Sequence, residues 1–112
     1  MEYEGFRREF NEYRLRLVFE ANRNKEMNEV WINLGKTYAN FGAKQKEMVP
    51  RVLGEWLESD DDGQRSDAEY LITNFNIPMA KEPVERLARR LAMSSSPAAR
   101  HELETVQRIL RG

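Results

Sequence analysis

The feature that most constrains this fold is the spacing of apolar residues, which recur at steps of three and four along most of the chain. Such steps place side chains on one side of an α-helix, which has about 3.6 residues per turn. Two stripes of this kind stand near the start, and they consist of Phe6, Phe10, Tyr13 and Leu17, and of Met27, Trp31, Leu34, Tyr38 and Phe41. No segment alternates apolar and polar residues as a half-buried strand would, so the sequence predicts an all-α fold.

Prolines, glycines and serines divide the chain into about six helices. The expected helices span residues 3–22, 25–40, 46–58 and 64–74, followed by one that Pro83 opens and one that ends near Leu110. Pro50 fits only a first helical turn, so the third helix should begin near Met48 or be kinked. Gly42 stands where a left-handed C-cap is expected, and Ser96 with Pro97 is typical of a helix start.

The six helices are expected to form antiparallel hairpins within a single domain over residues 1–112, either HEAT-like or an irregular bundle. A shift of about 34 residues, a period typical of helical repeats, aligns two parts of the chain. It places Leu53 on Leu87, Leu57 on Leu91, Asp62 on Ser96, Ile72 on Val106, and Phe75 on Ile109. Residues 43–77 and 78–112 are therefore possible paired repeats, with a plain bundle as the alternative. Core positions are expected for Trp31 and Trp56.

Few residues suit catalysis or a metal. The chain has no cysteine, which excludes disulfides and thiolate chemistry and fits a reducing cytosol. The single histidine, His101, lies among charged residues of the last helix and is expected at the surface. No glycine-rich phosphate loop or metal-ligand spacing occurs. We therefore expect no enzyme activity, cofactor or metal.

No long apolar run and no signal-peptide pattern occur in the sequence. The start, MEYEGFRREF, lacks the apolar core of a signal peptide, and no run approaches the roughly 20 apolar residues that cross a bilayer. The expectation is a cytoplasmic protein that does not bind membranes.

Charge is distributed unevenly along the chain. Residues 47–70 hold eight acidic residues against two arginines, whereas residues 1–46 and 81–112 are net basic, so the overall charge of −1 hides an acidic middle. One or two aspartates suffice to cap a helix and complement its dipole, and three in a row repel one another. A cationic partner would relieve that repulsion and associate faster with the chain. The other interpretation is a solvated charged loop.

The candidate partner-binding residues come from this acidic segment. They are Glu55, Glu58, Asp60, Asp61, Asp62, Arg65, Asp67, Glu69 and Tyr70. For Arg65 a structural role stands beside the binding role, namely a salt bridge to Asp61 or Asp62.

The C-terminal region raises a nucleic-acid alternative. Its arginines are Arg86, Arg89, Arg90, Arg100, Arg108 and Arg111. They alternate with glutamates on amphipathic helices, no recognition or base-stacking motif accompanies them, and a solvated face explains them better. We expect no nucleic-acid binding.

One segment carries a resemblance to a known family. Residues 49–77, VPRVLGEWLESDDDGQRSDAEYLITNFNI, cover about a quarter of the chain. The segment combines Trp56-Leu57, the Ser59-Asp60-Asp61 loop, Arg65, Asp67-Ala68 and Leu71-Ile72. In this it resembles the HEAT-like immunity proteins of bacterial polymorphic toxins and contact-dependent growth inhibition systems. The resemblance implies a non-catalytic protein, a monomer or one half of a 1:1 heterodimer. It would occlude the C-terminal domain of its cognate toxin, often a nuclease with a basic active-site groove.

An adaptor function is the alternative. A helical adaptor or scaffold would hold a partner peptide between hairpins, and it predicts an exposed apolar concavity. An inhibitor would act through a polar face instead.

Overall fold

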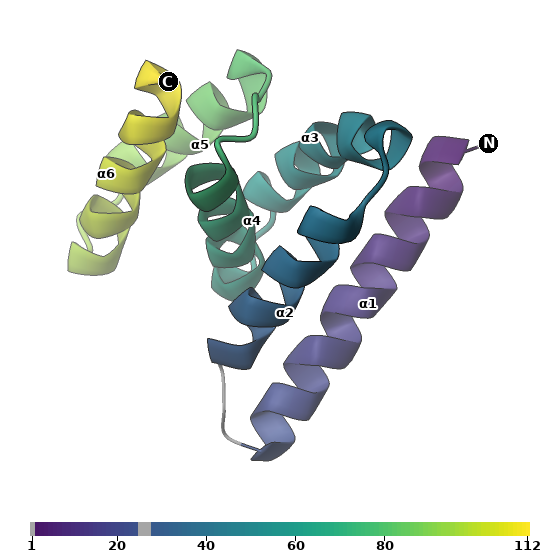
Figure 1. The fold of residues 1–112 in the computed structure, drawn as a ribbon. Coiled ribbons are helices and arrows are strands. Elements are labelled where there is room, and N and C mark those ends of the chain that lie inside the picture. Colours follow the sequence, from purple (N-terminus) through teal and green to yellow (C-terminus); the bar gives the residue numbers. More distant parts are fainter. Residues whose placement is uncertain (1, 25–27) are drawn as a thin grey trace. The chain divides into compact units, whose positions relative to one another are not determined.

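The computed structural model describes residues 2–24 and 28–112, which form six α-helices and no strand. The helices are α1 (Glu2–Asn24), α2 (Asn28–Asn40), α3 (Ala43–Leu57), α4 (Asp62–Phe75), α5 (Lys81–Ala92) and α6 (Pro97–Arg111) (Figure 1). The predicted all-α fold is confirmed. Among the described helices, none is both long enough and apolar enough to cross a membrane.

The helices belong to two compact units, Met1–Val52 and Leu53–Gly112. The boundary falls inside α3, so this helix contributes residues to both. The single domain over residues 1–112, with paired repeats at 43–77 and 78–112, stays a prediction.

In the first unit, α1 packs alongside α2 (Figure 1). Aromatic side chains contribute to the core of this unit. Phe6 and Phe10 of α1 are buried, and the ring of Phe41 lies edge-on to both, with centroids 5.3 and 5.5 Å away. Val30 and Leu34 complete this core from α2. The first predicted stripe therefore faces inward at its N-terminal end.

The second predicted stripe is partly wrong. Trp31 is 38% exposed, whereas Val30, Leu34 and Gly35 are the buried residues of α2. Val30 and Leu34 are four residues apart, so the buried face keeps Leu34 of the predicted stripe but includes Val30 in place of Trp31. Met27, expected on the stripe, lies outside the described residues together with the predicted start of this helix at Lys25.

The start of α3 also corrects the sequence analysis. The helix begins at Ala43 and continues through Pro50, so a start near Met48 is wrong. Gly42 does not adopt the left-handed conformation expected of a C-cap. Its carbonyl instead accepts a hydrogen bond from Lys46 N at 3.0 Å, and its N–H donates to Gln45 Oε1 at 3.0 Å. Gly42 therefore caps the start of α3. It does not adopt the positive φ that glycine tolerates better than other residues.

In the second unit, the end of α3 packs with α4, α5 and α6 around one core. Its fully buried large side chains are Leu53, Trp56, Leu57, Leu71, Val84, Leu87 and Val106. The burial of Trp56 confirms its predicted core position. α5 and α6 form a hairpin, and α4 packs against α6 (Figure 1). Ser96 caps α6 by accepting a hydrogen bond from Ala99 N at 3.0 Å, with Pro97 in the first turn as predicted.

Candidate protein-binding site

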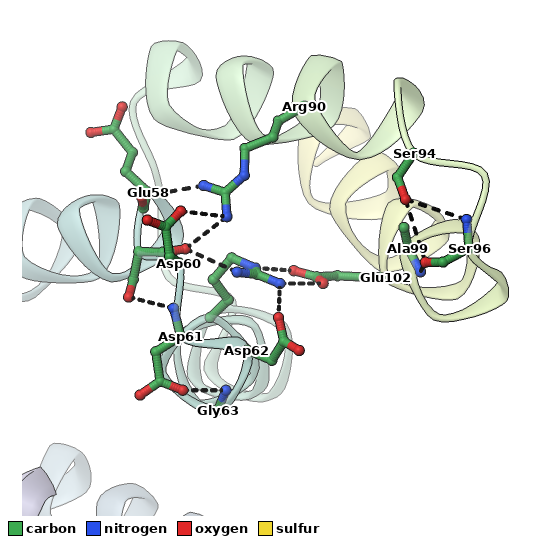
Figure 2. A network of polar contacts seen from close by, with 12 residues as sticks. Glu58, Asp60, Asp61, Asp62, Gly63, Arg90, Ser94, Ser96, Ala99 and Glu102 are labelled. Carbon is green, nitrogen blue, oxygen red and sulfur yellow. Dashed lines mark hydrogen bonds and ion pairs between the residues drawn. The ribbon is translucent and has the colours of Figure 1, made fainter.

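Within the acidic segment of residues 47–70, the acidic turn, Glu58 to Asp62, joins α3 to α4. Two short-range hydrogen bonds fix its backbone. Ser59 Oγ accepts a hydrogen bond from Asp61 N at 3.0 Å. Asp61 is the N-cap of α4, with extended φ and ψ of −79° and 113°, and its Oδ1 accepts from Gly63 N at 2.9 Å (Figure 2). Aspartate suits this position because its carboxylate satisfies an otherwise unpaired N–H and complements the helix dipole. The predicted capping role of the Asp60–Asp62 run is therefore confirmed for Asp61.

Arg65 of α4 connects the acidic turn to α6. Its side chain is 7% exposed and pairs with Glu102 of α6, with Nε 2.8 Å from Oε2 and Nη2 3.2 Å from Oε1. The same guanidinium contacts the carboxylate of Asp62 and donates from Nη1 to the Ser59 carbonyl at 2.9 Å. The predicted salt bridge of Arg65 is confirmed with Asp62 as the partner. These bonds tie the turn, α4 and α6 together.

Two arginines of α5, Arg86 and Arg90, also contact the acidic turn. Arg90 lies 3.3 Å from Asp60 Oδ1 and donates to the carbonyls of Glu58 at 3.3 Å and Ser59 at 3.1 Å (Figure 2). Arg86 pairs with the carboxylate of Glu58. The positive charges that relieve the repulsion between the acidic residues therefore lie within the second unit itself.

Two carboxyl groups, buried Glu69 and partly exposed Glu102, lie close to Arg65. Glu69 of α4 is 7% exposed, and its Oε2 has no hydrogen-bond donor among the described residues. Burial, followed by a hydrogen bond to Glu102 and the negative charge of Glu102, raises the pKa of Glu69 to about 9. Burial alone would also raise the pKa of Glu102, but hydrogen bonds from Arg65 and Glu69 outweigh it and lower that pKa. Glu69 is therefore the protonated member of the pair at neutral pH and donates to the ionised Glu102.

The pairing also acts on Arg65. Its hydrogen bond to Glu102 raises the pKa of the guanidinium further above its ordinary value, against the opposing effect of burial. With Glu69 neutral, the guanidinium of Arg65 faces two ionised carboxylates, those of Glu102 and of the exposed Asp62. Pairing of this kind is what permits a charged group under the surface of a small domain.

The candidate residues divide into exposed and buried sets. Asp60, Asp61, Asp62 and Glu58 are exposed, and the side chains of Asp60 and Asp62 are 102% and 90% exposed. Glu55 and Tyr70 are partly exposed. Arg65, Asp67 and Glu69 are buried. Grouping Asp67 and Glu69 with a surface patch was therefore incorrect, because both lie on the inward face of α4.

Three residues of this network were not among the candidates, namely Glu102, Arg86 and Arg90. Arg86 and Arg90 are four residues apart and share one face of α5, which was the available signal. Glu102 lies 37 residues from Arg65, and no local pattern connects them. His101, its neighbour on α6, is exposed as predicted.

The described residues contain no group of three or more histidine, cysteine, aspartate or glutamate side chains placed to hold a metal ion. The carboxylates of Glu58, Asp60 and Asp62 contact arginines, and that of Asp61 accepts a hydrogen bond from Gly63 N.

In comparisons with known proteins, no family model matches this chain, and neither a curated protein nor a solved structure matches it. The candidate site therefore stands on its own geometry, as a preformed acidic turn supported by buried and half-exposed arginines.

Proposed function

We propose that this chain is an immunity protein that binds a cognate bacterial toxin domain and neutralises it by occlusion, with no catalysis of its own. The observation that carries the proposal is the turn with three consecutive exposed carboxylates, Asp60 to Asp62, held in place by hydrogen bonds. The resemblance of residues 49–77 to immunity proteins supports it. The partner surface is cationic, as in the substrate groove of a nuclease.

Fixed geometry makes this turn suitable for binding. An acidic loop that is mobile before binding loses conformational entropy when it docks, and a preformed one avoids much of that cost. Here Asp61 is held as a helix cap, while Asp60 and Asp62 are oriented by Arg90 and Arg65. We expect the charges of this contact to increase the association rate and the specificity more than the affinity.

The internal arginines also limit what the turn can bind. A partner cation must share Asp60 and Asp62 with Arg90 and Arg65, and both carboxylates retain almost full exposure for such sharing. The proposed contact set is therefore Glu58 with Asp60, Asp61 and Asp62. Glu55 is partly exposed on α3 three residues before Glu58, whereas Tyr70, also partly exposed, lies about two helical turns into α4 and outside this set.

The proposal is tested with the toxin encoded by the neighbouring gene, by calorimetric titration of its C-terminal domain with the full chain. The variant D60N/D61N/D62N removes three charges and keeps a capping side chain at position 61, because asparagine caps as well as aspartate. The matched control E9Q/E12Q/E20Q removes three exposed charges of α1.

We expect a 1:1 complex that the aspartate variant weakens by about 100-fold or more, which corresponds to about 2.7 kcal/mol, with the control unchanged. Absence of binding by the wild-type chain would contradict the immunity function. Binding that is equally tight for the aspartate variant would remove the proposed site.

A further inference from the structure

The second unit carries a groove at the opposite end of α4 from the acidic turn. It has a volume of about 570 Å³ and is lined by the C-terminal end of α4, the segment joining α4 to α5, the start of α5 and the C-terminal end of α6. α4 has 14 residues, so the groove and the turn are separated by about 20 Å at a rise of 1.5 Å per residue. The groove is therefore a surface in addition to the proposed toxin contact.

The groove combines an apolar floor with an open rim. Ile72, Ile77 and Val84 are buried and form the floor, and Ile109 and Leu110 of α6 extend the apolar lining. The segment joining α4 to α5 leaves the helix through Asn76, whose φ is 51°. A volume of this size lies within the range of about 300 to 1,000 Å³ that is usual for ligand sites.

Two cations border the groove and have no acidic partner. Lys81 and Arg108 line it and are exposed, and the lining holds no acidic side chain, although the C-terminal residue Gly112 also belongs to it. Across the residues that the structure describes, neither forms an ion pair, and the guanidinium of Arg108 donates only to Thr105 Oγ1 at 3.2 Å. Arg65, Arg86 and Arg90, by contrast, are all paired at the other end of the unit.

We propose that this groove binds a peptide segment of a partner protein that combines apolar side chains with at least one carboxylate. The floor buries the apolar side chains, and Lys81 and Arg108 pair with the carboxylate at the rim. An open rim admits a continuous peptide chain, in the way that amphipathic segments bind to apolar grooves. This is also the apolar concavity that an adaptor function requires. The acidic turn and the groove carry opposite charge, so they bind different partner surfaces.

The experiment selects random 12-residue peptides displayed on phage against the full chain and measures the enriched peptides by fluorescence anisotropy. K81E/R108E reverses both rim charges. R8E/R89E is the matched control, because Arg8 and Arg89 are exposed and lie outside the groove lining. A second variant, A80W, places a large side chain on the exposed rim residue Ala80.

Enriched peptides are expected to pair large apolar residues with aspartate or glutamate. K81E/R108E and A80W are expected to weaken their binding by at least about tenfold, while R8E/R89E leaves it unchanged. Circular dichroism of each variant establishes that the helices are retained.

Three outcomes would overturn the proposal. The first is a selection that enriches no peptide, or only peptides whose binding survives both groove variants. The second is binding of sodium laurate without any peptide, which would assign the groove to small amphipathic acids. The third is self-association of the chain that K81E/R108E abolishes, which would assign it to a second copy.

Discussion

Arg65 determines how the acidic segment behaves at the scale of single residues. From the sequence, three consecutive aspartates suggested a repulsion that an external cation would relieve. In the structure Arg65 and Arg90 relieve it from within, by pairing with Asp62 and Asp60. The repulsion is therefore balanced within the second unit, and the proposed function depends on the fixed shape of the turn and not on its strain.

Replacing Glu102 by glutamine is expected to destabilise the second unit. Arg65 would keep its position under the surface but lose its main ionic partner, and breaking a buried pair in this way costs several kcal/mol. We expect about 3 kcal/mol, the low end of that range, because Glu102 retains 17% exposure. Urea unfolding followed by the fluorescence of buried Trp56, in a Trp31→Phe background, measures it. A loss no larger than that of the exposed-site control Glu104→Gln would contradict the role of the pair.

Glu69→Gln is expected to change the pH dependence of stability. The pKa of Glu69 is about 9 in the folded chain, whereas that of an unperturbed glutamate is 4.5, so between these values the unfolded chain has lost a proton that the folded chain retains. Stability is therefore lost as pH rises through this window. Glutamine, which resembles the protonated acid, removes that loss.

Urea unfolding at each pH measures the free energy of unfolding of Glu69→Gln and of the wild-type chain. The excess stability of the variant should be absent at pH 4 and grow toward pH 9. Glu104→Gln, at an exposed position of α6, serves as the control and should show no such trend. A difference between Glu69→Gln and wild type that is constant with pH would show that Glu69 is ionised in the folded chain.

At the scale of helices, apolar spacing predicted all six elements, but not every start, since α3 begins at Ala43 and the start of α5 has no side-chain cap. The errors arose where local signals were ambiguous. Trp31 and Val30 are adjacent and both fit a three-four spacing, so only packing against α1 decides which is buried. Gly42 stands between two helices, and its hydrogen bonds to α3 decide which helix it serves.

The position of the acidic turn in the chain could be predicted from the sequence, but the side chains that contact it could not. Composition alone placed Asp60, Asp61 and Asp62 between two helices. The pairing of Arg65 with Glu102 depends on how α4 packs against α6, which spacing does not report. The burial of Asp67 and Glu69 followed from the same unknown rotation of α4.

The N-cap of α4 provides a prediction at this scale. Asp61→Ala removes the acceptor of Gly63 N and is expected to cost about 1 kcal/mol of stability, while Asp61→Asn costs much less. The same Trp56 unfolding assay compares the two variants. Equal losses would show that the charge of Asp61, and not its capping bond, stabilises the turn.

A second prediction at the scale of helices concerns Gly54, at which α3 closely approaches the start of α5. A Cβ at this position would lie 3.4 Å from Pro83 Cγ, in ordinary contact. Gly54→Ala is therefore expected to be tolerated and to gain up to about 1 kcal/mol from helix propensity. Gly54→Leu should overpack the contact and lose about 1 to 3 kcal/mol. Thermal unfolding of both variants tests this, and a stable leucine variant would contradict the close packing.

At the scale of the whole molecule, the second unit separates charge along its length. Its acidic turn lies at the start of α4, and its unpaired cations Lys81 and Arg108 lie near the opposite end of that helix. Near-neutral net charge therefore conceals two surfaces of opposite sign. The central claim is that the acidic one contacts the toxin.

Amide hydrogen exchange of the full chain, alone and in complex with the C-terminal domain of the neighbouring toxin, tests that claim most directly. Slowed exchange is predicted to centre on residues 58–63, with little change in α1 and α2. Protection that falls on α1 and α2, while residues 58–63 exchange as in the free chain, would contradict it.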